Sequence, residues 1–202
     1  NYNRELGEDK AAAVPIGVDV EYFKPQQVEN KRNIISFLGA MNVAHNENAV
    51  NYFIEHIFPK VLEQVPDAIF YVIGGGVSTK LKSKETNNIV FTGRVDDVRK
   101  YLNDSKVFVC PMLFGSGIKT KNLEAMSLGL PVVTTSIGAE NIDAKSGEEW
   151  FVADTDYEFA ENVIEILKNN KLEQECSIAA RKYILNSFTW NVAKEKFERI
   201  LN

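Results

Sequence analysis

The stretch FGSGIKTKNLEAMSLGLPVVTTSIGAEN (residues 114–141) combines a glycine turn, an amphipathic helix and an apolar strand. After the two glycines, Leu123, Met126 and Leu130 recur at the spacing of one helix face. The run LPVVTTS that follows is rich in β-branched residues, which is typical of a buried strand. A helix that leads directly into such a strand predicts an α/β fold.

The same alternation extends over the rest of the chain. Short apolar runs predict further strands at residues 33–40, 68–73, 88–93, 106–112 and 148–153. Helical spacing of apolar residues predicts helices at residues 46–65 (interrupted near Pro59), 95–105, 156–169, 172–188 and 189–201. Strands that alternate with helices favour a mostly parallel sheet with helices on both faces. We therefore expect a doubly wound α/β domain with a helical C-terminal tail.

The composition is that of a soluble globular protein. With 202 residues the chain is long enough for one sizeable core, and its formal net charge of −5 provides no basic field for nucleic acid. The sequence contains no apolar run of about 18 residues, so we expect no transmembrane helix. Cys110 and Cys176 lie far apart without a CxxC partner, which disfavours a zinc site and favours a reducing, cytoplasmic compartment.

The domain boundaries can also be predicted. We expect residues 1–25 to form a linker and residues 26–202 to form one domain, with C-terminal helices over residues 155–202. The chain begins with Asn1 and not with Met, and no helix or strand pattern begins there. We therefore expect a fragment of a longer protein.

Four segments rich in glycine or polar residues follow the predicted strands. They are GAMNVAHN, GGGVS, TGRVDD and PMLFGSGIKTKN, in chain order. In open parallel sheets, ligands bind outside the carboxyl ends of the strands, where the strand order reverses. These four segments are therefore expected to share one cleft.

The glycine turn and the helix after it are chemically suited to a nucleotide. Gly115 and Gly117 allow positive φ and close backbone approach, and the start of a helix favours an anion. Lys119 and Lys121 add positive charge, so the turn could hold a phosphate or diphosphate. Glu124 would repel a phosphate but could accept hydrogen bonds from the hydroxyls of a ribose. The alternative is a solvated helix surface with Lys121 and Glu124 as an i,i+3 pair.

An ordered set of motifs resembles one family over nearly the whole chain. The motifs are AVPIGVDVEYFKP, FLGAMNVAHNENAVNYFIEHIFPKV, FYVIGGG, VFTGRVDDVRKYLNDSKVFVCPM, GSGIKTKNLEAMSLGLPVVTTSIGAENI and FTWNVAKEKFERIL. Together they resemble the C-terminal donor-binding domain of a GT-B glycosyltransferase, family 4-like, also called glycosyl transferases group 1. The resemblance implies a Rossmann-like domain that binds a nucleotide-diphosphate sugar, with no metal and no cofactor, in an enzyme of polysaccharide biosynthesis.

The resemblance further implies a second half. A saccharide or lipid-linked acceptor would bind an N-terminal domain that this chain lacks, and the sugar would be transferred with retention at its anomeric carbon. The chain alone is therefore expected to be inactive. Peripheral association of the full-length enzyme with a membrane is compatible with the resemblance.

The resemblance assigns roles to named residues. Lys119 would stabilise charge as the glycosidic bond breaks, and Glu124 would bind the ribose. The other residues expected to bind the donor are Gly39, Asn42, Gly74, Arg94, Val95, Gly115, Ser116, Gly117, Ile118 and Lys121. Many relatives carry two glutamates eight positions apart here, and Ser116 stands in place of the first. Many also carry an Arg and a Lys after the first strand, and GAMNVAHNEN has neither.

Three alternatives remain open. A nicotinamide-dependent oxidoreductase would require GxGxxG after the first strand, whereas GGGVST follows the second and does not match. A non-catalytic nucleotide-sugar-binding module and a GT-B sugar-nucleotide epimerase are the other two.

Several polar residues have structural interpretations. Asp154 and Asp156 mimic a metal-binding DxD motif, but Asp156 is expected to be a helix N-cap. Asn46 is likewise expected to be an N-cap. His45 beside it could reach the site, but a lone histidine in a loop usually lies on the surface.

Overall fold

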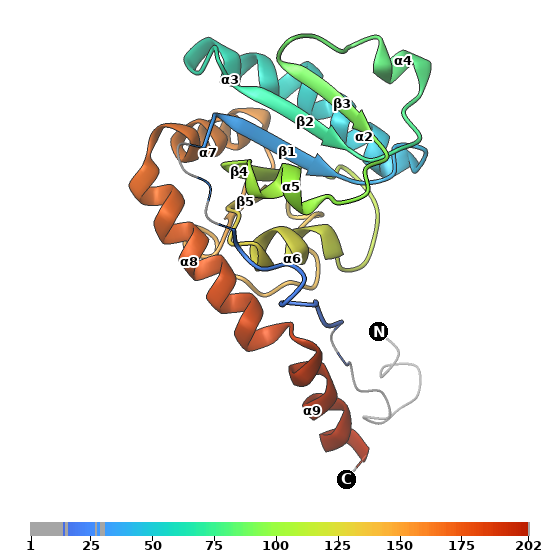
Figure 1. Ribbon diagram of the computed structural model, residues 1–202, viewed down its shortest axis with the longest axis vertical. Coiled ribbons are helices and arrows are strands. Elements are labelled where there is room, and N and C mark those ends of the chain that lie inside the picture. Colours follow the sequence, from blue (N-terminus) through green and yellow to red (C-terminus); the bar gives the residue numbers. More distant parts are fainter. Residues whose placement is uncertain (1–13, 15, 27, 29–30, 202) are drawn as a thin grey trace.

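The computed structural model describes residues 14, 16–26, 28 and 31–201. Its centre is a six-stranded parallel sheet with the strand order β3-β2-β1-β4-β5-β6 (Figure 1). The strands are β1 (Ile34–Leu38), β2 (Ile69–Ile73), β3 (Ile89–Gly93), β4 (Val107–Cys110), β5 (Val132–Thr134) and β6 (Phe151–Val152). All six lie within predicted strands, and the predicted doubly wound fold is confirmed.

The central strands are apolar because both of their faces are covered. All four residues of β4 are buried, as are the first four residues of β1. Phe37 of β1 stacks on Phe108 of β4 with the ring centroids 6.5 Å apart. On one face, Phe53 packs against Phe70 with the centroids 4.5 Å apart. Burial of a large apolar side chain contributes roughly 1.5–3 kcal/mol, so these strands anchor the core.

The first helical region differs from its prediction at its start and in its middle. It begins with α2 (Ala44–Tyr52), passes through a π-helical turn, η1 (Phe53–Ile57), and continues as α3 (Phe58–Gln64). Pro59 lies in the first turn of α3, where the missing N–H costs no helical hydrogen bond. The interruption near Pro59 is therefore confirmed, as a π-helical turn just before it. The N-cap is Val43 and not Asn46, so that prediction was wrong.

The remaining helices are α4 (Thr79–Lys82), which the sequence did not predict, α5 (Arg99–Asn103), α6 (Thr120–Ser127), α7 (Asp156–Lys168), α8 (Asn170–Ser187) and α9 (Trp190–Leu201). Of these helices, all but the C-terminal α9 lie around the sheet (Figure 1). Helix α7 packs against α3 and η1, whereas α6 packs against α8 (Figure 1). The strand order runs outward from β1 in one direction through β2 and β3, and from β4 in the other through β5 and β6. The carboxyl ends of β1 and β4 therefore meet at the point of reversal.

Helix α9 projects from the body of the protein at the end of the long α8 (Figure 1). Phe197 and Ile200 lie three residues apart on α9 and are about half exposed, at 51% and 47%. Residues at this spacing share one helix face. The described part of the chain thus leaves an apolar face of α9 uncovered.

The segment before β1 is tied to the domain by one arginine. The guanidinium of Arg181 on α8 donates to the carbonyl oxygens of Val20 at 3.0 Å, Phe23 at 2.9 Å and Ser127 at 2.6 Å. Val18 N–H also donates to the carbonyl of Phe188 at 2.7 Å. Because a planar guanidinium can bind several acceptors at once, Arg181 joins three segments that are distant in sequence.

We expect Arg181→Ala to lower the free energy of unfolding by about 1–3 kcal/mol, because three carbonyl groups lose their charged donor. Urea unfolding followed by circular dichroism measures this change. Lys171→Ala on the same helix is the control, since that side chain is 84% exposed and should change stability by about 0.5 kcal/mol or less. Equal unfolding midpoints for both variants would contradict the role of Arg181.

Candidate functional site

A pocket of about 400 Å³ lies at the carboxyl ends of β1 and β4. Its lining comes from the segments after these two strands and from the start of α6. The lining residues are Leu38, Gly39, His45, Asn46, Gly115, Ser116, Ile118, Lys119, Thr120, Lys121 and Glu124. The pocket therefore occupies the reversal point of the sheet, where an open α/β fold binds its ligands.

The glycine turn has the backbone that the sequence predicted. Gly115 has a φ of 113° and Gly117 a φ of 79°, both in the region that favours glycine. Helix α6 follows with Lys119 as its N-cap residue, and no described side chain caps it. The first N–H groups of a helix carry a partial positive charge. The start of α6, directly after the turn, therefore provides backbone donors beside the pocket.

Lys119 turns back into this turn. Its side chain is only 7% exposed, and its Nζ donates to the carbonyl oxygen of Gly117 at 2.6 Å. The ammonium group thus lies within the glycine turn. Its hydrogen bond stabilises the backbone of the turn, and its positive charge lies next to that backbone.

Lys121 extends in the opposite direction, toward β1. Its Nζ donates to Oδ1 of Asn46 at 2.5 Å and lies 4.4 Å from the centroid of the Phe37 ring. Burial lowers the pKa of Lys121 from its usual value. The Nδ2 of Asn46 in turn donates to the carbonyl of Ala40 at 3.0 Å. Asn46 is therefore a buried link between α6 and the segment after β1, a role that the sequence analysis missed.

Glu124 lies one helical turn beyond Lys121 and lines the same pocket. Burial raises the pKa of its carboxyl group, and the positive charge of Lys121 partly opposes this effect. The expected alternative, a solvated Lys121–Glu124 pair, does not match these contacts, because Lys121 is bonded to Asn46 and both side chains are partly buried. A partly buried carboxylate facing a pocket has acceptor capacity left for a ligand.

His45 also forms part of the pocket wall, so of its two expected positions the structure has the one at the site. It lies in the first turn of α2, and a Cβ atom at Gly115 would be 3.8 Å from its Nδ1. Burial lowers the pKa of His45, and the charges of Lys121 and Lys119 lower it further. Three basic side chains thus surround the pocket, one of them an imidazole biased toward its neutral form.

Gly39 and Gly74 are required by close packing at this edge. A Cβ at Gly39 would lie 2.8 Å from Nδ2 of Asn46 and 3.0 Å from Nζ of Lys121. Gly74 has a φ of 135°, and its Cβ would lie 2.0 Å from the carbonyl oxygen of Gly39. A side chain at either position would displace the pocket wall.

The other predicted residues lie along the same edge but outside the pocket lining. Asn42 is exposed and contacts Gly76, while Arg94 lies beside Gly75, where a Cβ would be 3.5 Å from that of Arg94. Val95 is partly buried against the core. The expected residues thus form two groups. One group lines the pocket, and the other, with Asn42, Arg94 and Val95, lies near the carboxyl ends of β2 and β3.

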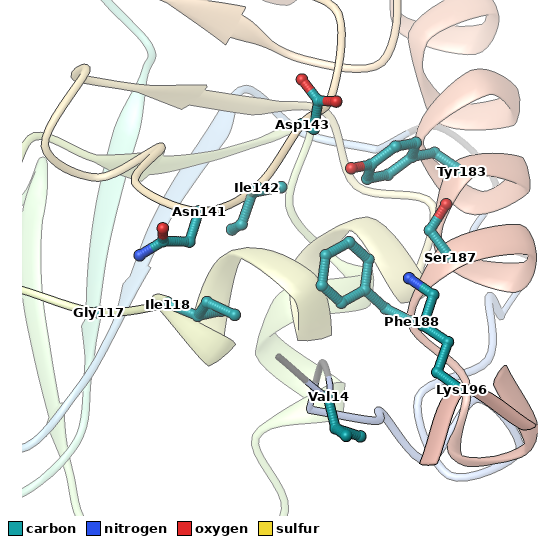
Figure 2. Close-up of a pocket in the computed structure, with 10 residues that line it drawn as sticks. All are labelled: Val14, Gly117, Ile118, Asn141, Ile142, Asp143, Tyr183, Ser187, Phe188 and Lys196. Carbon is teal, nitrogen blue, oxygen red and sulfur yellow. The ribbon is translucent and has the colours of Figure 1, made fainter. Parts of the chain in front are cut away.

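A larger cavity of about 860 Å³ adjoins the other side of the glycine turn (Figure 2). It is lined by Val14, Gly117, Ile118, Asn141, Ile142, Asp143, Tyr183, Ser187, Phe188 and Lys196. Burial, with Asp143 as the next contribution, raises the pKa of Tyr183 to about 12, so its hydroxyl stays protonated. Because Gly117 and Ile118 line this cavity and Ile118 also lines the pocket, the turn separates two open spaces.

The two DxD-like acids bind different protein partners. Asp154 accepts hydrogen bonds from the N–H and Oγ of Ser136, whereas Asp156 pairs with Lys60 at 2.8 Å. The N-cap of α7 is Thr155, whose Oγ1 accepts from the N–H of Glu158, so the prediction of Asp156 was wrong. Within residues 14, 16–26, 28 and 31–201, no cluster of His, Cys, Asp or Glu is arranged to hold a metal. None of the helices described is both long and apolar enough to cross a membrane.

Solved structures share this fold. A TarM mutant of S. aureus in complex with Fondaparinux, alpha-GlcNAc-glycerol and UDP superposes with a TM-score of 0.82 at 17% identity, over 100% of this chain and 42% of TarM. The C-terminal domain of the glycosyl transferase group 1 family protein LpcC from Francisella tularensis superposes with a TM-score of 0.68 at 18% identity, over 86% of this chain and 100% of that domain. At these identities the likeness concerns the fold.

Curated relatives match over most of the chain. It is 26% identical over 210 residues to the UDP-Gal:alpha-D-GlcNAc-diphosphoundecaprenol alpha-1,3-galactosyltransferase of Escherichia coli, covering 92% of this chain and 51% of that protein. It is 26% identical over 206 residues to the phosphatidyl-myo-inositol mannosyltransferase of Mycobacterium leprae (strain TN), covering 96% and 54%. The chain thus spans about half the length of these relatives. The family model described as glycosyl transferases group 1 matches residues 32–169, more than half of the sequence, and the chain belongs to this family.

Proposed function

We propose that this chain is the donor-binding half of a retaining glycosyltransferase and that its pocket holds a nucleotide-diphosphate sugar. The observation that carries the proposal is the pocket itself. It brings the glycine turn, the start of α6, Lys119 and Lys121 together at the reversal point of the sheet. Backbone donors and two ammonium groups at one point are suited to a diphosphate.

The phosphates would bind the turn at residues 115–118 and the two lysines. As the glycosidic bond breaks, negative charge grows on the departing diphosphate, and fixed positive groups stabilise it more than they stabilise the bound donor. Lys121 is held by Asn46 of α2, so its charge is already oriented at the pocket. This half of the enzyme needs no general base of its own for that task.

The nucleoside would extend from the phosphates along the same edge. Glu124 would accept hydrogen bonds from the ribose hydroxyls, with its carboxylate facing the pocket from α6. The base would lie near Arg94 and the backbone of Val95. Asn42 and Gly74 would lie between the base and the phosphates. Ser116 and the turn amides would contact the sugar.

The acceptor, a saccharide or a lipid-linked saccharide, would bind a separate N-terminal domain. The proposal includes the division into a linker at residues 1–25 and a donor domain at residues 26–202, a cytoplasmic location, and inactivity of this half alone. The exposed apolar face of α9 is available to pack on the remainder of the enzyme. Transfer of a sugar by residues 1–202 alone would contradict the proposed division of labour.

We expect Lys121→Ala and Lys119→Ala to weaken binding of a nucleoside diphosphate by about 10- to 150-fold, because each removes a charge-assisted hydrogen bond. Binding of the corresponding nucleoside should change little. Calorimetry with UDP, GDP, ADP and dTDP identifies the ligand and measures both effects. Lys171→Ala is the control for net charge, because the Lys171 side chain on α8 is exposed. An equal loss for nucleoside and diphosphate would refute the phosphate role.

Glu124→Ala should weaken binding of a ribonucleotide, since a ribose hydroxyl loses its carboxylate acceptor. The 2′,3′-dideoxynucleotide lacks those hydroxyls, so its affinity should be nearly the same for both proteins. The measurement is calorimetry of the wild type and the variant with each ligand. If the variant loses the same factor with both ligands, Glu124 does not bind the ribose.

Binding of the donor should tighten as the pH falls through the range in which His45 titrates. Burial and the two lysines lower the pKa of His45, and a bound diphosphate, being negative, would raise it. Because the complex then binds more protons than the free protein, lower pH favours the complex. Affinity for a nucleotide-diphosphate sugar is measured from about pH 8 to about pH 5.5, where histidine titrates. His45→Gln should flatten this dependence, and an unchanged pH profile in the variant would exclude the effect.

A further inference from the structure

A carboxylate of the chain binds the glycine turn. Glu140, in the loop between β5 and β6, accepts a hydrogen bond from the N–H of Gly117 through Oε2 at 2.7 Å. The same oxygen lies 3.9 Å from Nζ of Lys119. Neither contact was expected from the sequence. Glu140 is therefore bound to two of the groups that the proposed function gives to the diphosphate.

The contact between Glu140 and Lys119 has a physical reason. The Lys119 side chain is 7% exposed, and a buried ammonium without a counter-charge is strongly disfavoured. The carbonyl of Gly117 supplies a dipole to this ammonium, and Glu140 supplies the negative charge. The carboxylate thus compensates a cation that would otherwise be left unpaired inside the turn.

Glu140 and a bound phosphate cannot use the turn together. Both are anions, and both would take the N–H of Gly117, so they would repel each other at short range. The Glu140 side chain is 44% exposed, and the next residues of its loop, beginning with Asn141, line the open cavity in Figure 2. The carboxylate therefore has solvent and space to move into when another anion arrives.

We propose that Glu140 is an internal competitor for the phosphate position and sets the affinity of the donor site. In this structure it binds the turn, and when a diphosphate binds it yields the Gly117 N–H and the Lys119 charge to that ligand. Part of the binding free energy is spent on displacing it. Free nucleoside diphosphate, the product of transfer, is then held less tightly than the turn alone would hold it, which favours its release. This inference rests on the proposed donor-binding function.

The test compares pyrophosphate and UDP binding by the wild type and Glu140→Gln. The glutamine carbonyl can still accept from Gly117, so the turn keeps its hydrogen bond while the competing charge is lost. We expect the variant to bind both ligands at least about tenfold more tightly, as measured by calorimetry at low salt. We also expect the empty variant to melt at a lower temperature, because Lys119 loses its counter-charge, and pyrophosphate should restore the lost stability.

The matched control is Glu148→Gln. Glu148 lies in the same loop between β5 and β6, pairs with Lys145 and is 55% exposed, so its removal changes the net charge equally. Tighter binding in Glu140→Gln alone supports the inference. Equal affinities in the two variants, or weaker binding in Glu140→Gln, overturn it. If the wild type binds pyrophosphate and Glu140→Gln binds it equally well, the inference fails and the donor site stands. If neither protein binds pyrophosphate or any of UDP, GDP, ADP and dTDP, the proposed function fails as well.

Discussion

The reversal of strand order between β1 and β4 is the constraint on which the rest of this structure depends. From this point the chain adds β2 and β3 in one direction and β5 and β6 in the other. The helices that follow β1 and β4 therefore lie on different faces of the sheet, and the segments that lead into them diverge. The space left between these segments is the pocket, with α2 and α6 beginning at its two sides. A parallel sheet with a single direction of winding would have no such opening.

The pocket gathers basic side chains, although the chain as a whole carries a net negative charge. The formal net charge is −5, yet Lys119, Lys121 and His45 converge on one pocket of about 400 Å³. Each lysine is held by a specific hydrogen-bond partner: a backbone carbonyl for Lys119 and Asn46 for Lys121. A local cluster fixed by such contacts attracts an anion more specifically than a diffuse basic surface would, because its charges need not reorganise.

The glycine turn separates the pocket from the larger cavity. The pocket on one side faces β1 and α2, and the larger cavity on the other faces α8 and α9. Gly117 donates its N–H to Glu140 and accepts from Lys119 through its carbonyl oxygen, so this one residue links the two side chains.

The sequence by itself determined the layered fold, the order of its elements and the glycine turn. These features depend on local properties: β-branched runs form buried strands, helical spacing forms amphipathic helices, and glycine alone adopts the positive φ of residues 115 and 117 without strain. Only the tertiary structure decided that Asn46 binds Lys121 across 75 residues and that Glu140 binds Gly117 across 23. The sequence gives polar residues such as Asn46 and Thr155 several possible local partners, and which one each takes depends on the neighbours that the folded sheet brings near. Contact between distant side chains is fixed by packing, not by local pattern, and the chemistry of the pocket consists mainly of such contacts.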